Sequence, residues 1–315
     1  MVRSNVHPME SQEYAVFTPS IDSFFHIIRD WLHHKITGGY VYGVPRIGKS
    51  RAIKFWLAYL IKEECINCAL FRVIYSRSIQ PSWTHFYDEL LSSEDMGGSA
   101  LSGNKSLKRN KIINRLSLLA KATGGNQILF IIDEAQNLSI FDYKCFCDLQ
   151  SRLDNIGFRV TFVYVGSYEL NILHTNFRSV NDLQIVGRFS LNNYRFRGVC
   201  SQNELNYVLT GYDEDSEWPE NSSNSYTRYF YTRAFDAGSR LIDSCEIIWS
   251  SFIKLTPGER DSPEIPMEHV AKSVEYLFRE HSDTSAIQIQ FTIEQIEVAI
   301  KSTRYPEYAM GTMCE

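Results

Sequence analysis

The segment from Gly43 to Ser50 constrains the fold and chemistry of this chain more than any other part of the sequence. It reads Gly-Val-Pro-Arg-Ile-Gly-Lys-Ser, so two glycines separated by four residues are followed at once by a lysine and a hydroxyl residue. The glycines permit a tight loop whose backbone N–H groups wrap phosphates, Lys49 reaches the β- and γ-phosphate oxygens, and Ser50 ligates Mg²⁺. We therefore expect a nucleotide and Mg²⁺ to be bound here, by Gly43, Val44, Pro45, Arg46, Ile47, Gly48, Lys49, Ser50 and Arg51.

A second motif supplies two carboxylates. The run Ile128–Ile132 is apolar throughout and is followed by Asp133 and Glu134. A continuous apolar run bounded by turns indicates a strand buried on both faces. Asp133 would hold the Mg²⁺ shell and Glu134 would polarise the attacking water, which favours hydrolysis over phosphoryl transfer to another acceptor. The alternative is a pair of acids that stabilise the N-terminus of a following helix.

A third polar position follows the next predicted strand, Val160–Val165. This strand ends at Gly166 and Ser167. In a parallel sheet of the expected order, Ser167 would lie beside Asp133 at the edge where ligands bind, and its hydroxyl would contact the γ-phosphate or the attacking water. A serine that merely caps the following helix is an equally good interpretation.

Strands alternate with helices over the first 200 residues, which predicts a doubly wound α/β domain with a parallel sheet flanked by helices. After residue 200 only helical patterns remain, and we expect a small all-α domain over 201–315. The predicted strands cover about 40–42, 69–75, 127–132 and 160–165; the predicted helices cover about 20–36, 49–64, 81–91, 105–122, 140–155, 226–235, 238–255, 266–281 and 292–302.

The composition excludes a mainly disordered chain and predicts no membrane association. Apolar residues make up 44% of the 315 residues and charged residues 22%. The longest aliphatic or aromatic run, Ile128–Ile132, is far short of the about 20 residues that span a bilayer, and the first residues carry no apolar secretory core. We expect a soluble cytoplasmic protein.

The charge is unevenly distributed. The chain has a net charge of −5, but residues 1–200 carry +6 and residues 201–315 carry −11. Residues 96–132 contain no acidic side chain, and the predicted helix near 105–122 is basic, which predicts a surface for DNA phosphates or a solvated helix face. The candidate DNA-binding residues are Lys105, Lys108, Arg109 and Lys111, with Arg72, Arg77 and Arg152 as weaker candidates.

The seven cysteines predict reduced thiols, since their number is odd and no disulfide framework is visible. Cys65 and Cys68 form a C-x-x-C pair, and Cys145 and Cys147 could be imagined as its partner in a zinc site. The second pair has the wrong spacing and lies on a predicted helix, so we expect no zinc.

Taken in order, GVPRIGKS, ILFIIDEAQNL, VTFVYVGSYEL and the Val186–Phe189 segment VGRF resemble the AAA+ ATPases of DNA transposition, namely the TnsC/TniB group and, more distantly, MuB-like proteins. The resemblance covers about residues 15–300. It implies a P-loop AAA+ core with an all-α lid, ATP as the cofactor, and Ser167 as a polar sensor. It also implies that Arg188 is an arginine finger, with Arg195 and Arg197 as alternatives, and that Arg240 is a second sensor. An ordinary surface arginine on a helix is the alternative interpretation of Arg240.

The same resemblance implies a role and partners. Members of this group assemble as rings or helical filaments on double-stranded DNA and link a target-selection protein, TniQ-like in some systems, to transposase subunits, in the bacterial cytoplasm. Two alternatives remain open: another AAA+ protein that loads factors onto DNA, and a nucleotide-gated signalling scaffold with little turnover. DNA-stimulated ATPase activity would separate the transposition role from the scaffold. Binding to a transposase would separate it from the loader.

Overall fold

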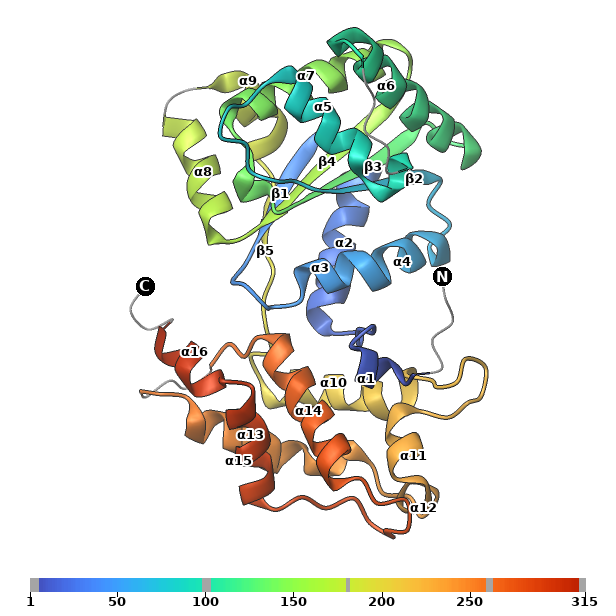
Figure 1. The fold of residues 1–315 in the computed structure, drawn as a ribbon, viewed down its shortest axis with the longest axis vertical. Coiled ribbons are helices and arrows are strands. Elements are labelled where there is room, and N and C mark those ends of the chain that lie inside the picture. Colours follow the sequence, from blue (N-terminus) through green and yellow to red (C-terminus); the bar gives the residue numbers. More distant parts are fainter. Residues whose placement is uncertain (1–5, 98–102, 180–181, 259–262, 312–315) are drawn as a thin grey trace. The chain divides into compact units, whose positions relative to one another are not determined.

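The computed structural model describes residues 6–97, 103–179, 182–258 and 263–311 (Figure 1). The chain divides into two compact units. The sheet unit comprises Ser23–Val44 and Leu57–Phe196, and the helical unit comprises Met1–Asp22, Pro45–Trp56 and Arg197–Glu315. A domain boundary near residue 200 stays a prediction.

The sheet unit is built on five parallel strands in the order β2-β3-β4-β1-β5. The strands are β1 (Gly38–Tyr42), β2 (Cys68–Ile74), β3 (Gln127–Asp133), β4 (Arg159–Gly166) and β5 (Asn193–Arg195). The predicted parallel α/β sheet is therefore confirmed. The strand β5 was not predicted from the sequence, because its three residues, Asn-Tyr-Arg, carry no apolar run.

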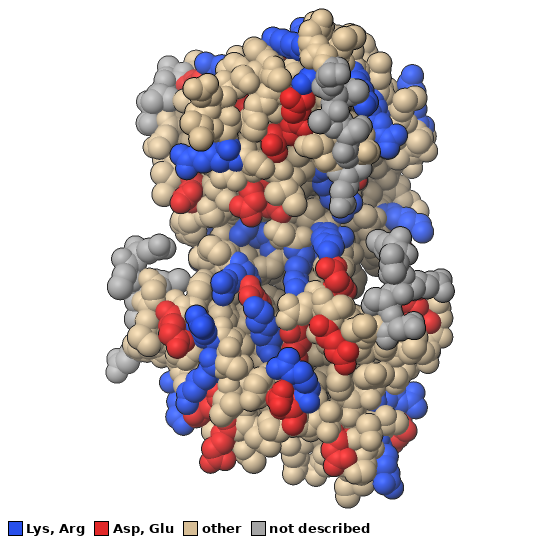
Figure 2. Space-filling model, in the orientation of Figure 1, with Lys and Arg blue, Asp and Glu red and all other residues tan. Residues whose placement is uncertain are grey.

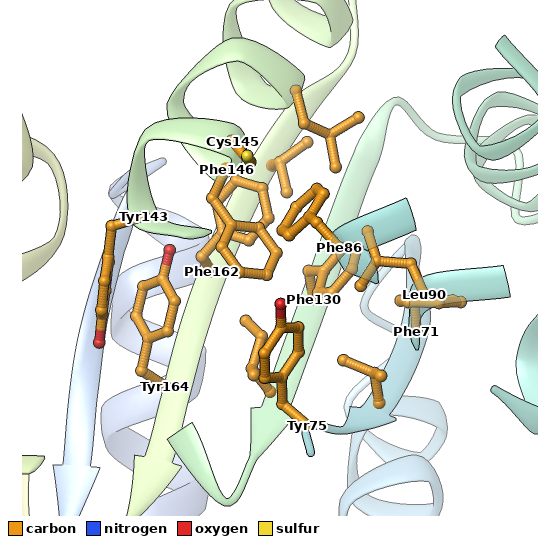
Figure 3. Packing of buried hydrophobic residues seen from close by; sticks show 14 of the residues in the cluster. Phe71, Tyr75, Phe86, Leu90, Phe130, Tyr143, Cys145, Phe146, Phe162 and Tyr164 are labelled. Carbon is orange, nitrogen blue, oxygen red and sulfur yellow. The ribbon is translucent and has the colours of Figure 1, made fainter. Parts of the chain in front are cut away.

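The apolar composition of β3 explains its interior position, between β2 and β4. Alternate residues point to opposite faces of a sheet. Phe130 joins a large aromatic cluster on one face, where it packs 4.4 Å from Phe71 and 5.2 Å from Phe162, measured between ring centroids (Figure 3). Leu129 and Ile131 are equally buried but lie outside that cluster, as expected for residues on the other face.

Helices complete the sheet unit. The aromatic cluster is covered by α5 (Trp83–Ser92), α6 (Lys105–Ala122) and α7 (Ile140–Asn155), which contribute Phe86, Ile112 and Phe146 to it (Figures 1 and 3). The other segments are α4 (Ala58–Glu63), α8 (Tyr168–Ser179), α9 (Leu183–Ile185), the π-helix η4 (Val186–Ser190) and the 3-10 helices η2 (Glu94–Met96) and η3 (Ala135–Asn137), while α2 (Pro19–His33) begins in the helical unit.

The helical unit has its own core, which includes Leu209, Phe252, Val274 and Ile300. The predicted helix over 226–235 is interrupted at Tyr231, where φ −134° and ψ 54° leave the helical region. The elements of the helical unit are α1 (Pro8–Ser11), α3 (Lys49–Arg51), the π-helices η1 (Ala52–Leu57) and η5 (Gly211–Asp215), α10 (Gln202–Thr210), α11 (Tyr226–Phe230), α12 (Thr232–Asp236), the 3-10 helix η6 (Leu241–Ser244), α13 (Cys245–Leu255), α14 (Met267–His281), α15 (Ile293–Ser302) and α16 (Tyr305–Gly311).

Two findings concern membrane spans and metal sites among the residues that the structure describes. No helix among them is both long and apolar enough to span a membrane. Within the same residues, no group of three or more His, Cys, Asp or Glu side chains is arranged to hold a metal ion. Cys65 is exposed, whereas Cys68, Cys145 and Cys147 are buried thiols.

Candidate functional site

The carboxyl ends of the five parallel strands lie at one edge of the sheet, where ligands of open α/β sheets bind. Gly43 follows β1 at this edge, and its N–H donates a hydrogen bond to the carbonyl oxygen of Gly166 at 3.3 Å. Asp133 ends β3 and Ser167 follows β4. The sheet order thus brings the start of the phosphate-loop motif, the carboxylate pair and the predicted sensor to neighbouring strand ends of the sheet unit.

The rest of the phosphate-loop motif has the backbone geometry that its sequence predicts. Arg46 has φ +66° and Gly48 has φ +115°, both in the left-handed region. Gly48 can adopt this conformation because it lacks a Cβ atom. It precedes α3, and its carbonyl oxygen accepts a hydrogen bond from the N–H of Ala52 at 2.9 Å. Lys49 and Ser50 therefore begin a helix, where the first N–H groups have no intrahelical acceptor and favour an anion.

Two arginines of the motif are engaged inside the helical unit. Nε of Arg46 lies 3.8 Å from Oε2 of Glu268, and the N–H of Glu268 donates to the carbonyl oxygen of Arg46 at 3.2 Å. The guanidinium of Arg51 donates to the carbonyl oxygen of Tyr14 at 2.5 Å and lies 5.9 Å from the centre of its ring. These side chains connect the loop to other parts of the helical unit.

The two carboxylates differ in exposure. Asp133 is 9% exposed, whereas Glu134 is exposed. Glu134 has φ +57°, a conformation that costs an ordinary residue about 1–3 kcal/mol, and its N–H donates to Oδ1 of Asp133 at 3.0 Å. The chain thus turns sharply after β3, and the Glu134 side chain leaves the sheet while Asp133 stays at its edge.

The structure adds Gln136 to this site. Its Nε2 donates to Oε2 of Glu134 at 2.5 Å, and its Oε1 accepts the N–H of Ser167 at 3.1 Å. The sequence signal is a polar residue two positions after Glu134, and its partner cannot be recognised from local sequence because Ser167 lies 31 residues further along the chain. Gln136 therefore joins two of the predicted catalytic positions.

Ser167 directly precedes α8 and its carbonyl oxygen accepts the N–H of Leu170 at 3.1 Å, but its side chain makes no capping hydrogen bond among the described residues. Its Oγ is buried and has no hydrogen-bond partner among the described residues. Buried hydroxyl groups without a partner are rare in folded proteins, and each requires an explanation such as a missing ligand or water. This observation fits a hydroxyl that contacts a bound phosphate or the attacking water, which was one of the two interpretations of the sequence.

Arg188, the predicted arginine finger, is held by its own subunit. Its Nη1 donates to the carbonyl oxygen of Cys147 at 3.0 Å, to Oε1 of Gln150 at 3.0 Å and to Oγ of Ser151 at 3.2 Å. All three acceptors lie on α7. A role at a neighbouring subunit would require the guanidinium to leave these acceptors.

The other arginines named from the sequence occupy three different environments. Arg195 ends β5, and its guanidinium lies 6.0 Å from the centre of the Tyr168 ring. Arg197 is exposed in the helical unit. Arg240 donates to the carbonyl oxygens of Phe235 and Ser239 at 2.7 and 2.9 Å. It also stacks 3.6 Å from the centre of the Phe235 ring, so its charge stabilises the end of α12.

The four residues predicted to bind DNA do not form one exposed face. Lys108 is 5% exposed and its Nζ lies 2.5 Å from Oδ1 of Asp88, so it is unavailable to phosphates while this ion pair exists. Lys105 lies 3.2 Å from the centre of the Trp83 ring, Arg109 lies 3.9 Å from Asp148, and Lys111 is half-buried.

The weaker candidates for DNA binding differ in exposure. Arg72 is paired with Asp95 and Arg152 with Asp148, whereas Arg77 is exposed. On the face drawn in Figure 2, basic and acidic side chains of the helical unit are interspersed.

The helical unit also contains a pocket that the sequence did not reveal. It is next to Ile47, a buried residue of the phosphate loop, and is formed by segments that are distant in sequence. Its lining residues are Thr18, Pro19, Ser20, Ile47, Arg197, Gly198, Val199, Glu204 and Met267. Both polar and apolar residues form the walls of this pocket.

Known proteins resemble this chain in sequence over one region and in fold over most of its length. Residues 34–173 match a family model described as an AAA domain. The fold is similar to that of the Aeropyrum pernix ORC2 protein in ADPNP and ADP complexes, with a TM-score of 0.56 and 11% identity over 95% of this chain and 72% of that chain. It is also similar to a Walker-type ATPase of Pyrococcus abyssi, with a TM-score of 0.50 and 13% identity over 93% and 73% of the two chains. No curated protein sequence matches.

Residues 34–173 therefore resemble an AAA domain, and the chain has the AAA+ fold. Identities of 11% and 13% establish similarity of fold alone. The assignment of individual site residues continues to depend on their chemistry and placement.

Proposed function

We propose that this protein is a Mg²⁺-dependent ATPase that works as an ATP-controlled assembly on DNA. The observation that carries the proposal is the arrangement at one sheet edge, where Gly43, Asp133 and Ser167 follow or end strands that neighbour one another in the order β3-β4-β1. The motif Gly43–Ser50 adds the lysine and hydroxyl that nucleotide phosphates and Mg²⁺ require.

The phosphates of ATP are bound by the backbone of the loop 43–50 and by Lys49. The left-handed conformations of Arg46 and Gly48 fit this role, since they turn successive N–H groups toward one region. Ser50 and Asp133 are the residues that would hold Mg²⁺, because a hydroxyl and a carboxylate are oxygen ligands of the kind that this ion prefers. Bound Mg²⁺ supplies charge neutralisation at the phosphates.

The activation of water for hydrolysis is assigned to Glu134, and Ser167 is assigned a supporting contact. Glu134 is exposed and its Oε1 is directed to no hydrogen-bond partner among the described residues, so it is available to take a proton from water. The unpartnered Oγ of Ser167 would contact the γ-phosphate or this water. Arg188 remains the candidate for the guanidinium supplied to a neighbouring subunit.

The residues around the pocket beside Ile47 are proposed to contact the adenine base. ORC2 of Aeropyrum pernix, which has a similar fold, was solved with adenine nucleotides. The Met267→Ala substitution tests the idea, since Met267 lines the pocket and lies outside the phosphate loop. It should weaken ATP and ADP to the same extent and leave inorganic tripolyphosphate binding unchanged.

The biological setting is proposed to be DNA transposition. The support is the ordered resemblance of GVPRIGKS, ILFIIDEAQNL and VTFVYVGSYEL to the TnsC/TniB group. In this role, ATP-bound subunits assemble on double-stranded DNA, associate with a target-selection protein and recruit transposase subunits, and hydrolysis disassembles them. DNA-stimulated turnover with binding to a transposase would support this role. Binding to a helicase or clamp would support a loader, and nucleotide binding with negligible turnover would support a scaffold.

The ATPase proposal is tested by Lys49→Ala, with Lys54→Ala as the matched control. Lys54 follows on the same helical segment, is exposed, and pairs at 2.6 Å with Glu13, so its loss should change stability by less than about 1 kcal/mol. Lys49→Ala should abolish binding of a fluorescent ATP analogue, whereas Lys54→Ala should bind it normally. Normal affinity in Lys49→Ala would refute the site assignment.

A further inference from the structure

We infer that Gln136 is a positioning residue for ATP hydrolysis: it holds the carboxylate of Glu134 and links it to the backbone at the end of β4. The inference rests on the proposed function, since it concerns the residue assigned there to water activation. Neither the AAA domain match nor the fold similarity assigns a role to Gln136.

The geometry identifies both ends of the link. Nε2 of Gln136 donates to Oε2 of Glu134 at 2.5 Å, and Oε1 of Gln136 accepts the N–H of Ser167 at 3.1 Å. The backbone of Glu134 is held as well, through its N–H on Oδ1 of Asp133. An exposed carboxylate at a sharp turn would otherwise rotate freely, so the amide is what fixes its orientation.

Only one orientation of the Gln136 side-chain amide satisfies both of its hydrogen-bond partners. The N–H of Ser167 needs an acceptor, which the amide oxygen supplies, and the ionised carboxylate needs a donor, which the amide nitrogen supplies. A flipped amide would place oxygen against carboxylate and nitrogen against N–H, and would lose both hydrogen bonds. Gln136 therefore fixes Oε2 of Glu134 relative to the end of β4, and Oε1 of Glu134 stays available to water.

Gly166 provides the space for this link. A Cβ atom at residue 166 would lie 2.3 Å from Oε1 of Gln136, which is far inside contact distance. The closest atom is the end of a flexible side chain, so a methyl group would displace the amide, while Cδ2 of Leu170 at 3.2 Å and the backbone nitrogen of Gln136 at 3.3 Å would have to shift by a few tenths of an ångström. The glycine before the predicted sensor thus has a specific function: it lets the amide reach the N–H of Ser167.

The experiment compares steady-state hydrolysis and ATP affinity in Gln136→Met, Gln136→Glu and Gly166→Ala. Gln136→Met keeps the length and removes the amide. It should lower kcat by about 10-fold to 100-fold, the range expected for misplacement of a reacting group, with KM and the ATP dissociation constant unchanged. Gln136→Glu puts a second carboxylate beside Glu134, so the acidic limb of the pH–rate profile should move to higher pH.

Gly166→Ala provides an independent route to the same defect. It should lower kcat as Gln136→Met does, and it should add little in a Gln136→Ala background, where the clashing side chain is gone. Melting temperatures of all variants establish that they are folded. A folded Gln136→Met protein with wild-type or raised kcat would overturn the inference, as would full additivity of Gly166→Ala and Gln136→Ala.

These outcomes are distinct from failure of the proposed function. If Glu134→Gln abolishes hydrolysis and Gln136→Met leaves it intact, the ATPase assignment stands and the positioning role is wrong. If wild type and Glu134→Gln hydrolyse ATP equally, the proposed role of Glu134 is wrong, and with it the premise of the inference.

Discussion

Nζ of Lys108 lies 2.5 Å from Oδ1 of Asp88, and this pair joins α6 to α5. Lys108 is 5% exposed, although the basic sequence around it predicted a surface for DNA. A buried lysine needs a partner for its charge, and Asp88 is that partner.

Lys108→Met should therefore destabilise the fold instead of weakening DNA binding. Removal of the ammonium leaves Asp88 without its partner, and we expect a loss of about 1–2 kcal/mol in the free energy of unfolding. Urea denaturation measures this loss, and Lys111→Ala on the same helix serves as the control. Unchanged stability together with reduced DNA affinity would contradict the structural role.

The prediction of a DNA-binding segment now rests mainly on Lys105 and Lys111, since Lys108 and Arg109 are engaged by Asp88 and Asp148. The double variant Lys105→Ala, Lys111→Ala should bind all duplex sequences more weakly. The slope of log affinity against log salt should fall by about 0.9 for each DNA phosphate that the variant no longer neutralises. An unchanged slope in the folded variant would direct attention to exposed Arg77.

Much of the sheet could be predicted, because each central strand is a continuous apolar run. The run Gln127–Ile132 agrees with β3 to within one residue. In contrast, β5 and the Lys108–Asp88 pair depend on tertiary packing: β5 is three residues paired to β1, and Asp88 lies 20 residues before Lys108. Local sequence patterns carry no information about such partners.

The candidate site could likewise be predicted only in part from the sequence. Lys49, Asp133 and Glu134 were identified because their chemistry and spacing belong to short motifs. The link from Gln136 to Ser167 could not be predicted, because it joins two strand ends through a side-chain amide. The hydrogen bonds from Arg188 to α7 could not be predicted either, because they depend on how η4 packs against α7.

Arg188→Ala tests whether this arginine acts on a neighbouring subunit. The variant should bind ATP normally and lose hydrolysis, because a guanidinium supplied by a neighbour contributes about 10³–10⁵ in rate. Mixing it with Lys49→Ala subunits should restore activity, since each supplies what the other lacks. No recovery at any ratio, together with a lowered melting temperature, would assign Arg188 to holding α7 and leave Arg195 or Arg197 as the finger.

The buried histidine His174 predicts acid sensitivity of the sheet unit. It is fully buried between the hydroxyl groups of Tyr143 and Ser190, at 3.0 and 2.7 Å, and burial lowers its pKa from 6.5 to about 3. The folded state therefore binds this proton less readily than the unfolded state. Its contribution to stability is complete above about pH 6.5 and is lost as the pH falls toward 3, by about 1.4 kcal/mol for each pH unit.

Unfolding free energies of wild type and His174→Gln between pH 7 and pH 4 check this expectation. The variant keeps a polar side chain and should show a shallower decline, whereas His34→Gln, at an exposed position, should leave the wild-type slope unchanged. Parallel curves for wild type and His174→Gln would show that His174 does not control the decline.

The central claim is that Glu134 activates water at an ATP site, and the most direct test is single-turnover hydrolysis of Mg²⁺-ATP by Glu134→Gln. The amide keeps the shape of the side chain and cannot accept the proton. We predict an unchanged ATP dissociation constant, a hydrolysis rate lowered at least about 100-fold, and longer-lived assemblies on DNA. Hydrolysis at the wild-type rate by a folded Glu134→Gln protein would contradict the account.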